Sequence, residues 1–310
     1  MSAKLKVQPV TPVALPPLVA MAEHLRAALP GFGDLEPLPG RAETSDLAAD
    51  LAHLARHDAD GFLIASRDND VLGFTVSFVR SRQLVISHLW LVPELADTAV
   101  AHALVRKAVA FGARSGVNDL AGHAVAGPEA QAVYFRHGLR PRFPVYRLTL
   151  PAEQARRIGS HLSSLLPGHE LTDEEVSRRA GTGEAERLDR LVRGIGRSLD
   201  HDYWLGSRHL RLALVREGQR VTGYAYGGAG QCGPVAATTS EAALAALGWA
   251  LRLAADGGAP TVSLYVPAPF ENGLETLLDA GAKCLAQTLW MSQTPPSGME
   301  RYVLAGPTLC

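Results

Sequence analysis

The sequence contains few cysteines, no excess charge of either sign and no long apolar run. Its three cysteines, Cys232, Cys284 and Cys310, form no Cys-x-x-Cys pair, so neither a zinc cluster nor a disulfide framework is expected. Thirty Lys and Arg residues against 31 Asp and Glu give a net charge of −1. A nearly neutral chain lacks the broad basic field that attracts nucleic acid or an anionic membrane, so neither partner is expected.

Membrane insertion and secretion are not indicated either. The sequence has no uninterrupted run of about 18 apolar residues, the length that predicts a transmembrane helix. Residues 1–17 lack the apolar stretch and the small-residue cleavage site of a secretory signal. We therefore expect a cytoplasmic protein.

The chain does contain enough apolar material for a folded core. Hydrophobic residues make up 47% of its 310 residues, which excludes general disorder. At roughly 100–200 residues per domain, this length predicts one large domain or two ordinary ones.

The two halves of the chain share one order of predicted elements. Residues 61–78 and residues 210–226 each form a pattern of two apolar strands joined by a polar turn, which predicts a β-hairpin. Both hairpins carry a Val-x-Gly-aromatic step in the second strand, at 71–74 and at 221–224. This parallel suggests that one structural unit occurs twice.

A third strand and a long helix follow each hairpin. We predict strands over 83–92 and 232–237. Helices are predicted over 96–114 and 240–255, where Ala, Leu and Val recur at spacings of three and four. Ser240, with an acidic residue after it, is the predicted N-cap of the second long helix.

Each half then closes with a strand, a second helix and further strands. The strands are predicted over 119–125 and 261–266, and the helices end at Gly138 and Gly281. The order β–β–β–α–β–α–β therefore occurs twice, which favours a mixed α/β sheet in each half. We place the domain boundary after residue 150, which gives domains of residues 1–150 and 151–310.

The remaining segments give weaker indications. Residues 152–205 are expected to form a connecting helix and the opening helices of the second domain, with residues 181–183 as a loop. Residues 200–202 (Asp-His-Asp) could contain an acid–histidine pair that orients the imidazole as a base. A shared metal ion is not favoured, because three adjacent side chains point in different directions. We interpret these residues as a helix end or a loop that contacts the other half. Cys232 is predicted in a buried strand, and residues 302–309 as a closing strand.

Two short motifs in the first half are more specific. One is Leu91-Val92-Pro93, at the end of a predicted strand, with Leu104 in the helix that follows. The other has the spacing Asn-x-x-Ala-x-x-x-Tyr-x-x-x-Gly-Phe, filled here by Gly127, Ala130, Tyr134, Gly138 and Leu139. On these residues the first half resembles the GCN5-related N-acetyltransferase (GNAT) superfamily, over about residues 4–150.

This resemblance implies both a fold and an activity. The fold class is α/β (an α+β mixed sheet), with two tandem GNAT-like modules, each a mixed, mostly antiparallel sheet flanked by helices. The activity is transfer of an acyl group from acetyl-CoA or another acyl-CoA to an amine, which attacks the thioester directly. The acceptor is expected to be a small-molecule or peptide amine. The chain is expected to be a monomer with an internal pseudo-dimer, or a homodimer.

The resemblance also implies site residues. Tyr134 is the candidate general acid, because a phenol can give a proton to the leaving thiolate. His88 is the candidate base for the ammonium substrate, and His123 is a weaker alternative. Ordinary structural roles compete with both assignments: a helix tyrosine half buried on the sheet, and a hydrogen-bonded sheet histidine.

The expected cofactor site departs from the family pattern. GNAT proteins bind the CoA pyrophosphate on an Arg-Gly-x-Gly-x-Gly turn, where backbone N–H groups and a helix dipole attract the anion. The chain has no glycine or arginine in residues 96–101, and Asp97 adds a negative charge. The expected cofactor-binding residues are Leu91, Val92, Ala96, Asp97, Thr98, Ala99, Val100 and Ala101.

The second half departs further, because Leu277 stands at the position of the first-half tyrosine. We interpret this half as a duplicate of the fold that lacks a donor site. The sequence thus leaves two functions open. One is a CoA-dependent N-acyltransferase that uses the first half, and the other is a non-catalytic GNAT-like binding or regulatory protein.

Overall fold

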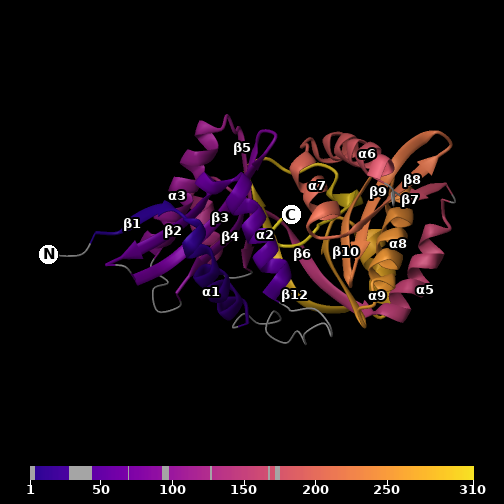
Figure 1. Ribbon diagram of the computed structural model, residues 1–310, viewed down its shortest axis with the longest axis horizontal. Helices are drawn as coiled ribbons and strands as arrows, with labels where there is room; N and C mark the ends of the chain where they lie inside the picture. Colours follow the sequence, from indigo (N-terminus) through magenta and orange to yellow (C-terminus); the bar gives the residue numbers. More distant parts are fainter. Residues whose placement is uncertain are drawn as a thin grey trace. The chain divides into compact units, whose positions relative to one another are not determined.

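The computed structural model (Figure 1) describes residues 4–27, 44–68, 70–92, 98–125, 128–166, 168–171 and 175–310. The chain divides into two compact units, each built from more than one segment of the sequence. Of the described residues, unit 1 comprises those within 4–143 and 288–295. Unit 2 comprises the described residues within 144–287 and 296–310.

Unit 1 contains a sheet whose strands follow the order β1-β2-β3-β4-β5. Strands β1 to β4 are antiparallel neighbours, whereas β4 and β5 are parallel. Its elements are β1 (Lys6–Pro9), η1 (Pro12–Ala14), α1 (Leu15–Ala27), α2 (Thr44–His57), η2 (Ala59–Gly61), β2 (Phe62–Arg67), β3 (Asp70–Arg80), β4 (Gln83–Leu91), α3 (Thr98–Arg114), β5 (Asp119–Val125), α4 (Pro128–Arg136) and the start of β6 (Arg140–Pro151).

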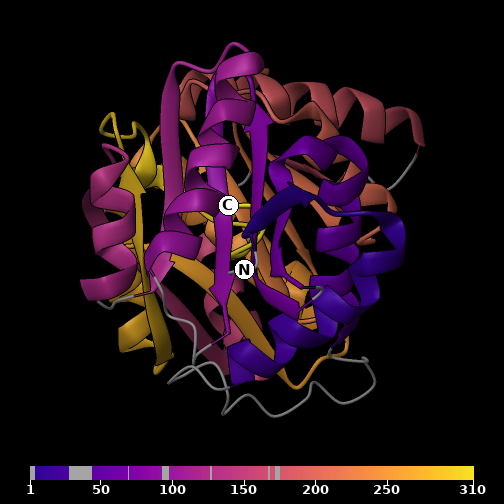
Figure 2. The same ribbon diagram turned by 90° about the vertical axis from the view of Figure 1, so that its left-hand side faces the viewer.

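Helix α3 packs on one face of this sheet because its apolar residues share one face. Val100, Leu104 and Ala108, at spacings of four, pack on Leu63 of β2 and Leu72 of β3. Figure 2 looks at unit 1 and shows α3 (magenta) and the pair α1 and α2 (indigo) on different sides of the strands. The sheet is therefore covered by helices on both faces.

Unit 2 repeats this plan with strand order β11-β10-β9-β8-β7, and β13 pairs with β10 off this path. As in unit 1, one neighbouring pair is parallel, β10 with β11. Its elements are the second part of β6, α5 (Ala152–Ser163), β7 (His169–Leu171), α6 (Glu175–Arg193), α7 (Ser198–Gly206), β8 (Arg211–Glu217), β9 (Arg220–Gly228), β10 (Gln231–Ala237), α8 (Ser240–Asp256), β11 (Thr261–Pro267), α9 (Glu271–Asp279), the start of β12 (Lys283–Ser292), η4 (Met299–Arg301) and β13 (Tyr302–Val303).

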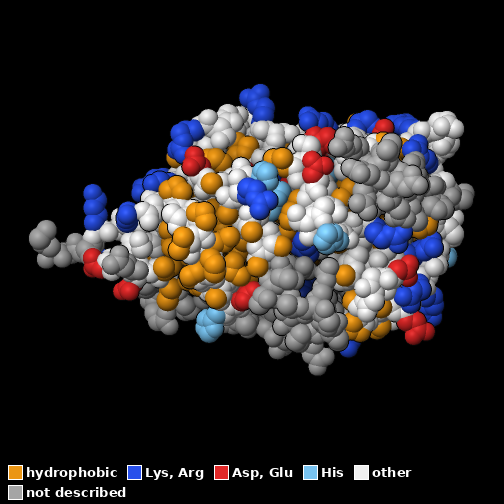
Figure 3. All heavy atoms as spheres, viewed as in Figure 1, with side chains coloured by type: hydrophobic (Ala, Val, Ile, Leu, Met, Phe, Trp, Pro, Cys, Tyr) orange, Lys and Arg blue, Asp and Glu red, His pale blue; other side chains and the backbone are white. Residues whose placement is uncertain are grey.

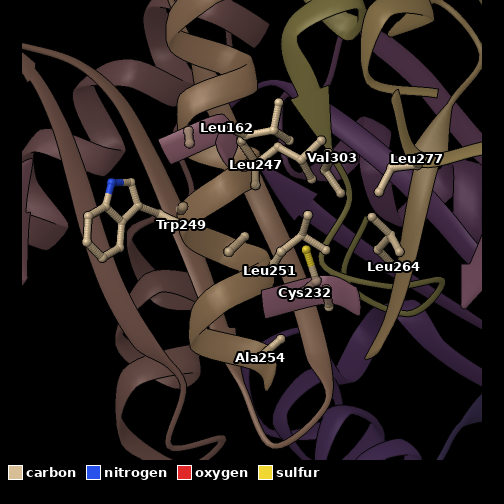
Figure 4. Close-up of a cluster of buried hydrophobic side chains, with 14 of the residues drawn as sticks. Leu162, Cys232, Leu247, Trp249, Leu251, Ala254, Leu264, Leu277 and Val303 are labelled. Atoms are coloured by element: carbon tan, nitrogen blue, oxygen red, sulfur yellow. The ribbon is translucent and has the colours of Figure 1, made fainter. Parts of the chain in front are cut away.

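The core of unit 2 surrounds the alanine-rich helix α8. Small residues let helices α5 and α8 approach closely, since a Cβ on Gly248 would lie 2.4 Å from the backbone N of Ser163. Figure 4 shows side chains of α8, such as Leu247 and Leu251, beside Cys232 of β10 and Val303 of β13. Residues from both ends of unit 2 therefore share one apolar core.

The two halves of the sequence exchange strands. The second part of β6, from the first half of the sequence, pairs antiparallel with β11 in unit 2. This pairing runs from Val145 opposite Pro267 to Pro151 opposite Thr261. The end of β12, from the second half, pairs antiparallel with β5 in unit 1. This pairing runs from Thr288 opposite Val125 to Ser292 opposite Ala121. Each unit is thus completed by a strand from the other half of the sequence.

The predicted order of elements is confirmed in both halves, with local corrections. Residues 181–183 lie inside helix α6, because Ala185, Leu188 and Val192 form a buried face that carries the helix through the glycines. Residues 200–202 lie within helix α7. The N-cap of α8 is Thr239 and not Ser240, since the Thr239 hydroxyl accepts a hydrogen bond from the N–H of Ala242 at 3.1 Å.

Two further findings concern the surface. On the face drawn in Figure 3, the basic and acidic side chains of the described residues are interspersed, as the net charge of −1 suggests. Among the described residues, no helix is both long and apolar enough to cross a membrane.

Candidate active site

The central strands of unit 1 part at the centre of the candidate site. Strands β4 and β5 pair over Gln83–Ile86 and Asp119–Gly122, and no pair of described residues joins them beyond that point. A bulge lies at the same place, because Val76 of β3 pairs with His88 and Ser77 pairs with Ile86. We call this position, beyond Ile86 and Gly122, the unit 1 strand gap.

Tyr134 of helix α4 lies at this strand gap. Its hydroxyl donates a hydrogen bond to the backbone carbonyl of His123 at 3.1 Å, and its side chain is 1% exposed. A Cβ on Gly122 would lie 3.2 Å from the Tyr134 ring, so the missing side chain makes room for the tyrosine. The sequence predicted this residue, and the structure places its hydroxyl on the first β5 residue beyond the pairing.

His88 faces the other side of the sheet. Leu89 and Leu91 pack among residues of α3, and side chains alternate along a strand. His88 and Trp90 therefore point to the opposite face, where their rings lie 5.8 Å apart. The His88 side chain is 8% exposed, and its carbonyl accepts a hydrogen bond from the Thr75 hydroxyl at 2.8 Å.

His123 shares the face of His88. Gly122 faces Tyr134, so the next residue along β5 points away from it. The His123 ring meets Trp290 edge-on at 5.0 Å, and its Nδ1 lies 3.2 Å from the hydroxyl oxygen of Thr288. Both neighbours come from β12, so the exchanged strand orients this imidazole. Local sequence patterns contain no signal for this contact.

The expected cofactor-binding residues lie where β4 ends and α3 begins. The backbone N–H of Val92 already donates to the carbonyl of Leu72 at 3.0 Å. Thr98 is the first residue of α3, Ala99 is exposed, and the side chains of Val100 and Ala101 are buried in the core. Leu91 packs on that core, whereas Ala96 and Asp97 lie outside the described residues.

Unit 2 has the corresponding position but fills it. Strands β10 and β11 pair at Gln231 and Ser263, and beyond this pair β13 lies between them. The bulge recurs here, because Cys232 pairs with Gly227 and Val235 pairs with Ala225. We call the position beyond Gln231 and Ser263 the unit 2 strand gap.

Comparison with known proteins rests on structure, since neither a protein-family model nor a curated protein sequence matches the chain. A candidate acetyltransferase from Pyrococcus horikoshii matches with a TM-score of 0.72, 14% identity, and coverage of 99% of this chain and 96% of that chain. A GCN5-related N-acetyltransferase from Sphaerobacter thermophilus matches with a TM-score of 0.61, 16% identity and coverage of 95% and 96%. The chain has the fold of the GCN5-related N-acetyltransferases.

A third neighbour supports the tandem arrangement. A tandem GNAT protein from the clavulanic acid biosynthesis pathway matches with a TM-score of 0.56 and 12% identity, and the match covers 93% of this chain and 98% of that chain. The prediction of a tandem GNAT fold is therefore confirmed. At these identities the likeness establishes the fold alone.

The GNAT fold of unit 2 encloses a polar cluster that the sequence reading missed. Asp189 of α6 accepts a hydrogen bond from the Tyr224 hydroxyl at 2.7 Å, and its other oxygen lies 3.1 Å from Nε2 of His201. Nδ1 of His201 lies 3.0 Å from the Tyr226 hydroxyl. All four side chains are fully buried. Their contacts join helices α6 and α7 to strand β9.

Burial sets the electrostatics of this cluster. It raises the pKa of Tyr224 well above its ordinary value, and the Asp189 carboxylate raises it further. Arg197 is paired with Asp200 at 2.9 Å; burial alone would lower its pKa, but Tyr302 and then Asp200 outweigh that effect and raise it. Asp200 and His201 are therefore buried with their partners, whereas Asp202 is exposed. Among the described residues, no group of three His, Cys, Asp or Glu side chains could hold a metal ion.

The two buried cysteines of this GNAT fold are poor nucleophiles. Cys232 lies buried in β10, as predicted, and burial raises its pKa. Burial also raises the pKa of Cys310, to about 11. Cys284 is exposed, and partial burial raises its pKa. Covalent thiol chemistry is therefore not favoured at Cys232 or Cys310.

Proposed function

We propose that the protein is a CoA-dependent N-acyltransferase that reacts at the unit 1 strand gap. The observation that carries this proposal is the position of Tyr134, whose hydroxyl lies on the first β5 residue beyond the last β4–β5 pair. This tyrosine and the two histidines lie on opposite faces of the sheet, so we assign the acid to one face and the base to the other. Such an arrangement suits a transfer that delivers one proton and removes another.

The proposed reaction is a direct attack. The amine nitrogen forms a bond to the thioester carbonyl carbon, and the tetrahedral intermediate collapses with cleavage of the carbon–sulfur bond. The CoA thiolate takes a proton from Tyr134, while His88 takes the proton that the new amide nitrogen loses. Proton exchange with solvent then restores both groups. The products are an amide and CoA with a free thiol.

The two faces of the sheet would divide the substrates. The acyl donor would lie on the Tyr134 face, where α3 begins. The acceptor, a small-molecule or peptide amine, would lie on the face of His88 and Trp90. His123 is a second candidate base there, since Thr288 and Trp290 hold its ring in one orientation.

The phosphates of CoA would bind at the start of α3. Residues 96–101 and the end of β4 are the proposed binding segment, because the first amides of a helix attract anions even where glycine is absent. Asp97 would oppose a phosphate with a like-charge cost of about 1 kcal/mol in a solvated geometry. We therefore expect weaker CoA binding than a glycine-rich turn would provide.

A second function, acyl-CoA binding without turnover, is favoured by another observation. The Tyr134 hydroxyl is buried and already hydrogen-bonded to the carbonyl of His123. If that bond persists when a donor is bound, the phenol cannot protonate a thiolate. The protein would then act as a GNAT-like binding or regulatory protein.

Thermal unfolding with acetyl-, propionyl- and longer acyl-CoA tests the cofactor assignment. A ligand at 100 times its Kd stabilises the native state by about 2.7 kcal/mol, which raises the melting temperature measurably. Acyl transfer to a panel of primary amines, followed by release of free CoA thiol, then separates the two functions. Stabilisation with turnover supports the enzyme, stabilisation without turnover supports the binding protein, and no stabilisation by any acyl-CoA contradicts both.

A further inference from the structure

Residues 302–310, the last residues of the chain, form hydrogen bonds to both strands that flank the unit 2 strand gap. Val303 pairs with Val235 and Tyr302 pairs with Ala236, on β10. On the other side, the N–H of Leu304 donates to the carbonyl of Tyr265, on β11, at 3.0 Å. The segment thus replaces the β10–β11 pairing that ends at the start of the gap.

Strand β10 is shaped to receive this segment. Gly233 has a φ of +114°, and a Cβ on it would lie 2.6 Å from the carbonyl oxygen of Leu304 and 3.3 Å from Cγ1 of Val303. Only glycine fits this position, both sterically and conformationally. The next residue, Pro234, has no N–H, so it has no backbone donor to offer a ligand.

One buried arginine holds both ends of the segment. Arg197 donates from Nη1 to the Tyr302 hydroxyl at 3.2 Å and from Nη2 to the carbonyl of Leu309 at 3.1 Å. Its Nε donates to Asp200 at 2.9 Å, which keeps the guanidinium in this orientation. Between these ends, the carbonyl of Ala305 accepts from the Gln231 side chain at 3.0 Å.

The segment also belongs to the apolar core. Tyr302, Val303, Leu304 and Cys310 are fully buried, and Leu309 is 1% exposed. Figure 4 shows the Val303 side chain beside Leu247 of helix α8. A loosely attached terminus does not have this degree of burial, because ordering each residue costs about 1–2 kcal/mol that its contacts must offset.

We propose that residues 302–310 are the resident occupant of the unit 2 strand gap, and that unit 2 therefore binds no acyl donor. The occupant lies where unit 1 would receive its donor, so the chain would bind one acyl-CoA, in unit 1. The number of one acyl-CoA per chain rests on the proposed function, whereas the occupancy of the unit 2 strand gap does not.

The three cysteines report on this occupancy without any added probe site. Cys310 lies in the segment, Cys232 lies on β10, and Cys284 is exposed on β12. We expect iodoacetamide to modify Cys284 readily and Cys310 at least 100-fold more slowly, as read by peptide mass spectrometry. Each rate is divided by the rate at the same site in urea, which removes differences in intrinsic thiol reactivity.

Saturating acetyl-CoA should leave the Cys310 rate unchanged. Modification of Cys310 as fast as that of Cys284, or acceleration of Cys310 modification by acyl-CoA, would overturn the proposal. If acyl-CoA does not bind at all, the proposed function fails, but the labelling rates still decide whether the gap is occupied. Binding of two acetyl-CoA molecules per chain, measured by calorimetry, would also overturn the proposal.

A pair of glycine variants sharpens this test. Gly233→Ala introduces a methyl group 2.6 Å from the carbonyl oxygen of Leu304, which must then move. We expect this variant to raise the rate of Cys310 modification at least tenfold. Gly258→Ala is the matched control, because Gly258 also has a positive φ, +81°, but has open space around its Cβ position. Equal Cys310 rates in the two variants would contradict the proposal.

A milder variant serves if Gly233→Ala does not fold. Tyr302→Phe removes the hydroxyl that accepts from Nη1 of Arg197 and keeps the ring. It should raise the Cys310 rate severalfold and leave the Cys284 rate unchanged. An unchanged Cys310 rate in this variant would then overturn the proposal.

Discussion

The two strand gaps occupy the same place in the order of elements, and each lies beside a β-bulge. In unit 1 the bulge carries Ser87 and His88, and Tyr134 approaches from helix α4. In unit 2 the bulge carries Gly233 and Pro234, and Leu277 stands in the place of the tyrosine. The second gap is closed by residues 302–310, whereas at the first gap Tyr134 lies on one face of the sheet and His88 and His123 lie on the other.

This difference teaches that the GNAT fold alone does not define a site. Both units retain the parting of two parallel strands, because that feature belongs to the sheet. A donor also needs free backbone amides and a chemically competent side chain beside the gap. In unit 1 Tyr134 is the proposed side chain of this kind, whereas Leu277 stands at its position in unit 2, so predictions that treat the two units differently test the assignment most directly.

Loss of Arg197 should have the largest effect on stability. Arg197→Met removes the ion pair with buried Asp200 and the hydrogen bonds to Tyr302 and Leu309, so the free energy of unfolding should fall by about 3–5 kcal/mol. Urea denaturation measures this change. Arg156→Met is the control, since Arg156 pairs with Asp256 at 3.0 Å in a half-exposed pair that contributes about 0–1 kcal/mol. Similar losses in the two variants would contradict the assigned role of Arg197.

Tyr134→Phe should separate the two units by activity. Removal of the proposed general acid should lower kcat by at least about 100-fold, and loss of its hydrogen bond should cost about 1 kcal/mol in stability. Tyr224→Phe in unit 2 removes a hydroxyl that is equally buried and bonded to Asp189. That control should be destabilised by about 1–3 kcal/mol and keep its turnover. If both variants lose turnover equally, Tyr134 has no special role.

Gly122→Ala tests the support of Tyr134. The new Cβ would lie 2.8 Å from the carbonyl oxygen of Ile86 and 3.2 Å from the tyrosine ring. Overpacking of this kind costs about 1–3 kcal/mol and should also reduce turnover, because the ring must move. Gly206→Ala, which meets no atom within 4 Å, should change stability by less than about 0.5 kcal/mol. Steady-state kinetics and thermal unfolding measure both variants, and a neutral result at Gly122 would contradict the assigned packing.

The smallest expected effect is a pH dependence in unit 1. Nδ1 of His102 lies 3.4 Å from Nε2 of His137, and burial lowers the pKa of both. Arg136 and Arg106 lower that of His102 further, and His102 itself and Arg106 lower that of His137. Protonation therefore favours the unfolded chain: stability is full above about pH 6.5 and falls as the pH drops toward the lower folded-state pKa values.

Replacement of both histidines by glutamine should reduce the loss of melting temperature between pH 7 and pH 5. His161→Gln, at an exposed position of helix α5 in unit 2, is the parallel control. A double variant with the same pH dependence as the parent protein would show that this pair does not titrate with unfolding.

The sequence predicted the elements well because their signals are local. Alternating apolar residues define a strand such as β5, whose predicted range of 119–125 agrees with the structure. Residues 181–183 were predicted wrongly as a loop because glycine is a strong local signal, whereas the buried face that extends helix α6 depends on packing.

The candidate site could be proposed in part from the sequence. Tyr134 and His88 were identified from the resemblance and from their places on predicted elements. The contact between His123 and Thr288 joins residues 165 positions apart, so no local pattern contains it. For the unit 2 gap, the sequence offered one signal, Gly233 and Pro234 inside a predicted strand. Both residues weaken a strand, and in that position they indicate a bulge or the close approach of another segment.

The amino-acid sequence by itself determined three properties: the order of strands and helices, the duplication, and the absence of the glycine turn. Each of them depends on residues that are neighbours along the chain. Only the tertiary structure decided which strand completes each sheet and what lies in each strand gap. The reason is that β12 and residues 302–310 satisfy their backbone hydrogen bonds with strands distant in sequence, and many such pairings are compatible with one local pattern.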